Sequence, residues 1–216
     1  GGSGDDTFYV DSLLDTVLET SSGGTDTVVS RVSHVMGPNL ENLTLTGTRA
    51  AVGTGNSSAN VLTGNSAANL LNGGGGDDTI AGEGGNDTLN LFTGSSLLGP
   101  IDGGDGTADL INLLGVNTGK LTSVYNVELL DVEDGAWTIT DDQTYSSGVT
   151  IFAGAELVVG EGTVVIRQGD QRIVVQVPGL DDPAALKALL GQTAKLEFKL
   201  VDTTAAPSDV AQGIAP

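Results

Sequence analysis

The chain has no cysteine, a single histidine and only eight basic residues among its 216. Without cysteine, neither a disulfide framework nor thiolate chemistry is possible. His34 stands alone, which leaves no nucleophile–base pair, and we expect it at the surface or at a sheet edge rather than in a catalytic or metal site. No apolar run approaches the roughly 18 residues of a membrane span. We therefore expect neither an enzyme nor a membrane-spanning segment.

Positive charge is also scarce, and its scarcity limits the partners. Eight basic residues against 28 acidic ones give a net charge of −20, which argues against nucleic acid and anionic membranes as partners. The charge is uneven, because residues 1–162 hold three basic and 22 acidic residues, whereas residues 163–216 hold five and six. Glycine divides in the same way, 29 against four. Two different kinds of sequence therefore meet near residue 162.

A nine-residue repeat dominates the centre of the chain. The stretch 72–90, NGGGGDDTIAGEGGNDTLN, states the same pattern twice, and two weaker copies precede it. The copies begin at Gly55, Gly64, Gly73 and Gly82. Their sixth and eighth positions stay in step, as Asn60, Asn69, Asp78 and Asp87, and as Leu62, Leu71, Ile80 and Leu89.

Each position of the repeat has a physical reason. The last three residues predict a very short strand whose central aliphatic side chain points inward, and the first six predict a tight turn that needs glycine. Two units complete one coil, and coils stack about 4.8 Å apart. Asn60 should then lie over Asp78, and Asn69 over Asp87. Stacked turn carbonyls and these side chains would form an all-oxygen cage, which suits a hard cation such as Ca²⁺.

The pattern G-G-x-G-x-D-x-U-x resembles the RTX, or hemolysin-type, calcium-binding repeat. The resemblance implies a right-handed parallel β-roll, Ca²⁺ as the bound ion and a secreted bacterial protein that folds after export. It places the ligands on side chains at the sixth position and on the turn backbone. The candidate metal residues are Asp78, Asp87, Asn60, Asn69, Gly73, Gly74, Gly75, Gly76, Gly82, Glu83, Gly84 and Gly85, with Asp6 from GGSGDDTFYV (1–10).

The flanks of the repeat are less regular. In IDGGDGTADLINL (101–113) the acid falls one place late, at Asp109, so we expect no regular site there. Asp6 lacks a stacking partner upstream of Gly1. Each cage in the repeat then has one carboxylate rather than two, and we expect about two weakly bound Ca²⁺ ions. Residues 107–162 read as an irregular β-solenoid in which Trp137 is a packed strand residue.

The end of the chain is of another kind. Strands at 164–167 and 172–177, a helix capped by Asp182 and a strand at 195–201 give the order β-β-α-β. Residues 167–202 closely resemble the periplasmic first domain of SecD, a subunit of the bacterial Sec translocon accessory complex. We interpret the chain, which begins at Gly1, as a fragment and as a chimera of these two families.

The sequence thus predicts a mainly β protein, a parallel β-roll or β-solenoid followed by a small α+β fragment. The expected segments are a degenerate RTX-like β segment, the calcium-binding roll, an irregular β-solenoid, the SecD-like fragment and a flexible tail, at residues 1–54, 55–99, 100–162, 163–202 and 203–216. The expected function is calcium binding that drives folding of a secreted, extracellular protein, with type I secretion machinery as a partner of the parent protein. Two alternatives stay open: a structural stalk of a cell-surface adhesin, and a periplasmic export factor of the SecD type.

Overall fold

The computed structural model describes residues 1–92, 99–115, 118–139, 145, 147–152, 155–159 and 164–167. The chain divides into two units, residues 1–176 and 177–216, and all described residues belong to the first. Every regular element among them is a β-strand. The predicted strands at 172–177 and 195–201, the predicted helix after Asp182 and the tail at 203–216 lie outside the described residues.

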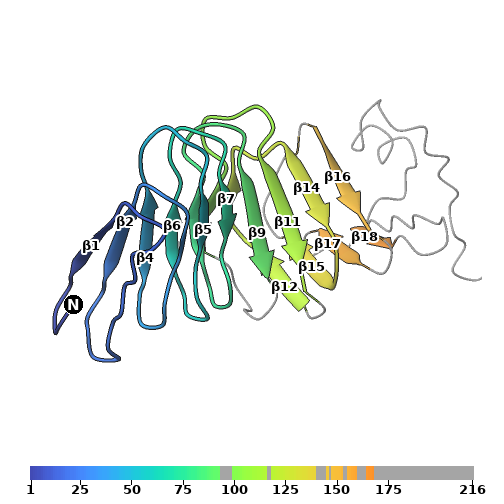
Figure 1. The fold of residues 1–216 in the computed structure, drawn as a ribbon. Helices are drawn as coiled ribbons and strands as arrows, with labels where there is room; N and C mark the ends of the chain where they lie inside the picture. The colour runs from blue at the N-terminus through green and yellow to red at the C-terminus, as the bar shows by residue number, and fades with distance from the viewer. Residues whose placement is uncertain are drawn as a thin grey trace, which may run out of the picture. The chain divides into compact units, whose positions relative to one another are not determined.

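Two seven-stranded parallel sheets face each other across a common core, and successive strands alternate between them through most of the chain (Figure 1). The first sheet contains, in order, β1 (Thr7–Val10), β2 (Thr27–Ser30), β4 (Asn42–Leu45), β6 (Val61–Thr63), β8 (Thr79–Ala81), β10 (Ile101–Asp102) and β13 (Val124–Tyr125). The second contains β3 (His34–Val35), β5 (Val52–Thr54), β7 (Leu70–Asn72), β9 (Thr88–Phe92), β11 (Leu110–Leu114), β14 (Leu129–Val132) and β16 (Gly148–Ile151). This arrangement is the predicted parallel β-solenoid.

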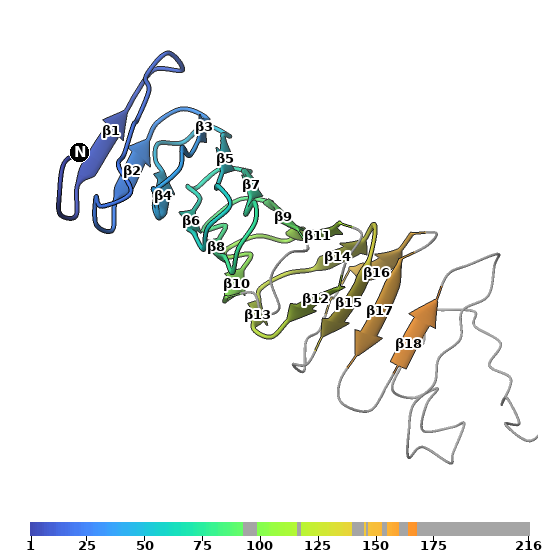
Figure 2. The same ribbon diagram turned by 90° about the horizontal axis from the view of Figure 1, so that it is seen from below.

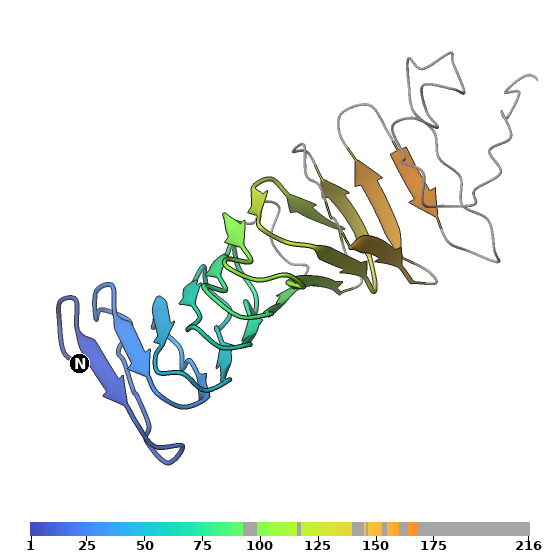
Figure 3. The same cartoon turned by 90° about the horizontal axis from the view of Figure 1, so that it is seen from above.

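A third sheet joins the solenoid after β11. It contains β12 (Thr118–Leu121), β15 (Ala136–Ile139), β17 (Glu156–Val159) and β18 (Val164–Arg167). Figures 2 and 3 show these strands in succession beyond β10 and β13. β17 pairs parallel with β15, whereas β18 pairs antiparallel with β17. The predicted strand at 164–167 is therefore present, and β17 is its partner among the described residues.

The strands of the first three repeat units, β6, β7 and β8, are three residues long, and in each one only the middle side chain is buried, as the repeat predicts. Val61 pairs with Thr79, and Leu70 with Thr88, so each coil here consists of two repeat units. The inward residues Leu62, Leu71, Ile80 and Leu89 are at most 1% exposed. Burying one such aliphatic side chain per strand stabilises the fold by about 1.5–3 kcal/mol each time.

Outside the repeat the coil length varies while strand pairing stays in register. Thr27 pairs with Asn42 across a coil shorter than two repeat units, and Thr88 pairs with Leu110 across a longer one. The difference in length lies in the turns. β9 and β11 are also longer strands, and each places two aliphatic side chains in the core, Leu89 and Leu91 against Ile111 and Leu113.

Trp137 is fully buried in β15, as predicted for a packed strand residue. Its indole N–H donates to the carbonyl of Asp134 at 3.0 Å. Gly119, its partner on β12, leaves the space that the ring fills, because a Cβ at Gly119 would lie 2.5 Å from a ring carbon. The buried side chains of the third sheet thus include Trp137 together with Leu121, Ile139 and Leu157.

Candidate metal centre

Turns of the repeat stack directly on the turns two units away in the sequence. The N–H of Gly75 donates to the carbonyl of Asn56 at 2.9 Å, and the N–H of Gly84 to that of Asn65 at 3.1 Å. Gly76 requires glycine, since its φ is +103° and a Cβ there would lie 2.5 Å from the carbonyl carbon of Ser58. The predicted stacking of turns 55 on 73 and 64 on 82 is thus present.

Glu83 takes the position that Gly74 has in the previous turn. Both have a left-handed backbone, with φ of 73° for Glu83 and 95° for Gly74. A side chain in this region carries strain that glycine avoids. The turn keeps its shape without the glycine, and the carbonyl of Glu83 accepts a hydrogen bond from the N–H of Asp105 on the next coil.

Acidic and amide side chains form a column across the second sheet, at the points where its strands begin. Asn69, Asp87, Asp109 and Glu128 each directly precede a strand, β7, β9, β11 and β14. The N–H of Asn69 donates to Oδ1 of Asp87 at 2.6 Å, the N–H of Asp87 to Oδ1 of Asp109 at 2.7 Å, and the N–H of Asp109 to Oε2 of Glu128 at 2.8 Å. Each carboxylate thereby adds one hydrogen bond to those that pair its strand with the preceding strand of the sheet.

The late position of Asp109 in its sequence motif does not displace it in the structure. The longer coil between β9 and β11 places its additional residues in the turns, so Asp109 precedes β11 as Asp87 precedes β9. The pair Asp87–Asp109 consequently has two carboxylates, whereas the pairs Asn60–Asp78 and Asn69–Asp87 have one each.

A second column runs along the first sheet. Asp6, Asp26, Glu41, Asn60 and Asp78 precede β1, β2, β4, β6 and β8. The N–H of Asp6 donates to Asp26, that of Asp26 to Glu41, and that of Asn60 to Asp78, at 2.8, 2.8 and 2.9 Å. Asp6 therefore has a stacking partner, Asp26, on the following coil rather than upstream. The stretch SSGGTDTVV (21–29) carries the signal that sequence reasoning missed, with Asp26 at its sixth position and the buried Val28 at its eighth.

Two carboxylates of the column along the second sheet have an oxygen with no partner. Asp87 and Asp109 are 1% and 0% exposed, and Oδ2 of each is buried without a hydrogen bond. A Cβ at Gly82 would lie 2.5 Å from Oδ2 of Asp87 and would also collide with the carbonyl oxygen of Gly103. Buried anionic oxygens beside a turn carbonyl need a positive partner, since a buried charge without one is costly. These residues fit a hard cation, which takes carboxylate and carbonyl oxygens.

Asn60 and Asn69 are satisfied within the protein itself. Oδ1 of Asn60 accepts the N–H of Asn56, and Oδ1 of Asn69 accepts the N–H of Asn65, both at 2.7 Å. The amide nitrogen of Asn60 donates to the carbonyl of Leu40 at 2.9 Å. An asparagine at the sixth position therefore closes its own turn.

Burial acts against the charged form of the ladder carboxyls. It raises the pKa of Asp78 to about 7, although the N–H of Asn60 opposes the shift and the charge of Asp77 adds to it. It raises the pKa of Asp87 to about 6, where the N–H of Asn69 opposes and Asp109 adds. The pKa of Asp109 is raised for the same first reason. Without a cation, keeping these three carboxylates charged near neutral pH therefore costs folding free energy.

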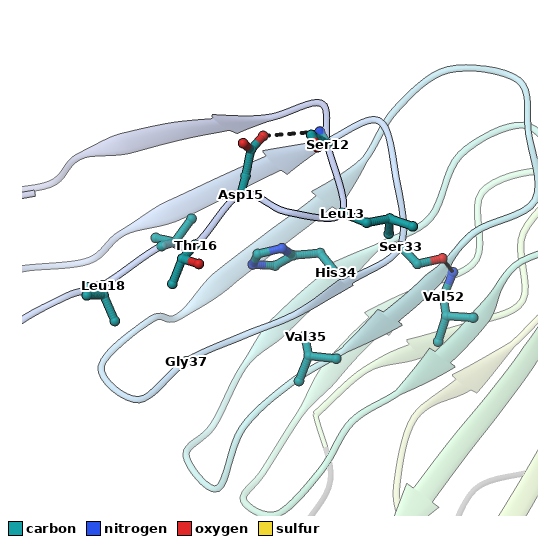
Figure 4. Close-up of a pocket in the computed structure, with 11 residues that line it drawn as sticks. Ser12, Leu13, Asp15, Thr16, Leu18, Ser33, His34, Val35, Gly37 and Val52 are labelled. Carbon is teal, nitrogen blue, oxygen red and sulfur yellow. Dashed lines mark hydrogen bonds between the residues drawn. The ribbon is translucent and has the colours of Figure 1, made fainter.

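His34 lies apart from both columns, on β3, which is the end strand of the second sheet, as the edge prediction required. Burial lowers its pKa. Figure 4 shows it in a pocket between the segment 12–18 and the residues Val35, Gly37 and Val52. No cysteine exists and no second histidine shares this pocket, so the donor set for a transition metal is missing.

Comparison with known families agrees with this geometry in the repeat. Residues 54–89 match the RTX calcium-binding nonapeptide repeat, in four copies. Residues 156–203 match the N-terminal P1 domain of the protein translocase subunit SecDF, a match that begins at the first residue of β17. No solved structure matches the chain. No helix that could cross a membrane is found in the part of the chain that the structure describes.

Similar curated proteins are found for the second region. The protein translocase subunit SecD of Acetobacter pasteurianus is 57% identical over 47 residues, 20% of this chain and 9% of that protein. Those of Syntrophobacter fumaroxidans and Escherichia coli K12 are 53% and 51% identical over 49 and 53 residues, 23% and 24% of this chain. The chain spans about a tenth of the length of these relatives. It therefore joins two family signatures, an RTX calcium-binding repeat at residues 54–89 and a SecD-like segment at residues 156–203.

Proposed function

We propose that the chain binds Ca²⁺ through its stacked glycine turns and that this binding drives the solenoid to fold once the protein is outside the cell. RTX nonapeptide repeats are calcium-binding, and residues 54–89 carry four of them. The single observation that carries the proposal is the pair of buried, unpartnered carboxylate oxygens of Asp87 and Asp109.

The ligand assignment follows the columns. Asp78, Asp87 and Asp109 supply carboxylate oxygens, and Asn60 and Asn69 supply amide oxygens. The turns contribute backbone carbonyls, from the residues Gly73, Gly74, Gly75, Gly76, Gly82, Glu83, Gly84 and Gly85. A bound cation supplies the positive charge that the buried oxygens lack. Because affinity rises with the number of charged ligands, the Asp87–Asp109 pair should hold Ca²⁺ most tightly.

Folding and binding are coupled through charge. Residues 1–162 carry most of the net charge of −20 and most of the 33 glycines, which favours an expanded chain where Ca²⁺ is scarce. Where Ca²⁺ is abundant, binding only to the folded state adds stability of about 2.7 kcal/mol per site at a hundredfold excess over Kd.

Folding that depends on Ca²⁺ suits an extracellular protein, and the RTX repeats also suggest an extracellular location. The SecD-like segment favours a periplasmic location instead, and type I secretion machinery stays a prediction for the parent protein. Neither matched family is enzymatic, so we infer a binding and structural role rather than catalysis. A second candidate, a surface stalk, is favoured by Asn60 and Asn69, whose side chains are satisfied without a metal.

A circular dichroism titration from EGTA to about 10 mM Ca²⁺, with Mg²⁺ in parallel, tests the proposal. We expect a cooperative gain of β signal with Ca²⁺ only. The double substitution Asp78→Asn and Asp87→Asn should shrink this gain, because asparagine keeps the Oδ1 acceptor and removes the charge. The control is Asp77→Asn, which removes one carboxylate from an exposed neighbour of Asp78. Full β signal in EGTA that Ca²⁺ leaves unchanged would instead support the stalk.

A further inference from the structure

A second group of carboxylates lies on the first coils, outside the matched repeat at residues 54–89. Asp6 precedes β1, Asp26 precedes β2, and Glu19 lies near the end of the segment 11–20, which follows β1. One oxygen of each carboxylate lies within 4.8 Å of the other two. The three residues are far apart in sequence, and the coil from β1 to β2 brings them together.

Asp26 points to a ligand independently of the clustering. It is 0% exposed, its Oδ1 accepts the N–H of Asp6 at 2.8 Å, and its Oδ2 is buried with no partner. A Cβ at Gly23 would lie 2.8 Å from that Oδ2 and 2.7 Å from Oε1 of Glu19. Both oxygens therefore face the same space beside Gly23, which only a residue without a side chain leaves open.

The structure already places one positive charge at the rim of this group. The ammonium nitrogen of Gly1 lies 2.8 Å from Oε2 of Glu19. The N–H of Gly2 donates to Oδ2 of Asp6 at 2.9 Å. Three carboxylates against one ammonium leave an excess of negative charge, and Oδ2 of Asp26 still has no partner.

We propose that Asp6, Glu19 and Asp26 form a separate site for a divalent cation of the Ca²⁺ type. Three carboxylates offer up to six oxygens, and hard cations of this size take six to eight. Magnesium, which demands an octahedral arrangement at shorter distances, fits a partly open carboxylate group less well. The inference depends on the proposed function only in the choice of Ca²⁺ as the probe.

The site would fasten the segment 11–20 to the first coil. This segment lies against β3, the end strand of the second sheet, and lines the pocket around His34 (Figure 4). The carbonyl of Glu19 accepts a hydrogen bond from the side chain of Asn39 at 3.1 Å, and Val17 packs against the core. Leu13, Leu14 and Leu18 on the same segment are at least 75% exposed, so few apolar contacts hold it. A cation shared by Glu19, Asp6 and Asp26 would supply the missing attachment.

Isothermal titration of Ca²⁺ into the full chain tests this site. Glu19→Gln should remove one bound ion from the stoichiometry, and Asp26→Asn should do the same while keeping the acceptor for the N–H of Asp6. The matched control is Asp11→Asn, which removes the same charge from an exposed residue of the same segment and should leave the stoichiometry unchanged. If Glu19→Gln and Asp11→Asn behave alike, the proposal is overturned.

A second background separates this site from the ladder. In a chain carrying Asp78→Asn, Asp87→Asn and Asp109→Asn, one ion should still bind, and adding Glu19→Gln should abolish it. Loss of all binding in the triple variant, with its β signal intact, would overturn the separate site and leave the ladder proposal standing. An unchanged stoichiometry in the triple variant would refute the ladder alone. If the triple variant does not fold, the Glu19→Gln stoichiometry in the otherwise unchanged chain decides.

Discussion

The substitution Asp87→Asn should change the stability of the protein in opposite directions with and without calcium. In the structure, Oδ1 of Asp87 accepts the N–H of Asn69 at 2.6 Å, and asparagine can keep that bond. Oδ2 has no partner and lies beside a turn that presents the carbonyl of Gly103. An amide nitrogen in place of Oδ2 would find an acceptor there. The metal-free protein should therefore gain stability.

The size of the gain follows from the cost of keeping this carboxylate charged. Burial raises its pKa from 3.8 to about 6, and roughly 1.4 kcal/mol per pH unit gives an upper bound of about 3 kcal/mol at neutral pH. Solvent that reaches the glycine turn screens part of this cost, so we expect about 1–2 kcal/mol. With calcium, Asp87 belongs to both the Asn69–Asp87 and the Asp87–Asp109 pair. Its loss should weaken binding about tenfold at each, about 1.4 kcal/mol per site, and the two losses together exceed the gain of the metal-free protein.

Urea unfolding followed by circular dichroism at neutral pH, in EGTA and in excess Ca²⁺, measures both effects. The variant should unfold at higher urea than the unchanged chain in EGTA and at lower urea in Ca²⁺. Asp77→Asn, an exposed neighbour in the previous turn, is the control and should move neither midpoint by much. If Asp87→Asn destabilises the protein in EGTA as well, Oδ2 has a partner that the structure does not show, and the reasoning fails.

The remaining predictions concern pH, turn geometry and the core. The folded-state pKa of Asp78 lies above its ordinary value, so the metal-free protein should lose stability as pH rises from about 4 to about 7. The Ca²⁺-bound protein should gain stability over the same range. Urea midpoints measured across this range, with and without Ca²⁺, test the reversal. Gly76→Ala should cost about 1–3 kcal/mol, since its left-handed backbone and the Ser58 carbonyl carbon exclude a Cβ, whereas Gly75→Ala, whose Cβ would meet only ordinary contacts, should be nearly neutral in the same assay. Leu62→Ala should cost about 2–5 kcal/mol, measured by urea unfolding in Ca²⁺, because Leu62 is fully buried; the neighbouring Val61→Ala, at a 44% exposed position, should cost far less.

The repeat could be predicted in detail because its signal is periodic. Gly55, Gly64, Gly73 and Gly82 recur at a constant spacing, and a two-strand coil then fixes which residues stack. The position of Asp109 could not be predicted in the same way. Its coil is longer than two repeat units, and a sequence does not show how many of the additional residues a turn absorbs before pairing resumes.

The acidic group on the first coils was hidden for a different reason. Asp26 follows a degenerate turn, SSGGTD, that keeps two of the glycines, and Glu19 belongs to a segment with no period at all. Glu19 approaches Asp26 only because the segment folds back along the coil. Such a contact depends on the path of a loop, which no local pattern encodes.

The hydrogen bonds of the two columns all have one direction. In each pair described above, the residue that donates its N–H comes earlier in the chain, and the residue whose carboxylate accepts comes later, as Asn60 does with Asp78 and Asp87 with Asp109. The two columns thus have a direction along the solenoid: each coil donates an N–H to a carboxylate of the coil that follows it in the chain. If the coils form in order from the C-terminal end, each new coil finds the carboxylate acceptor for its N–H already in place. If they form in order from the N-terminal end, the N–H of each new coil has no carboxylate acceptor until the next coil forms.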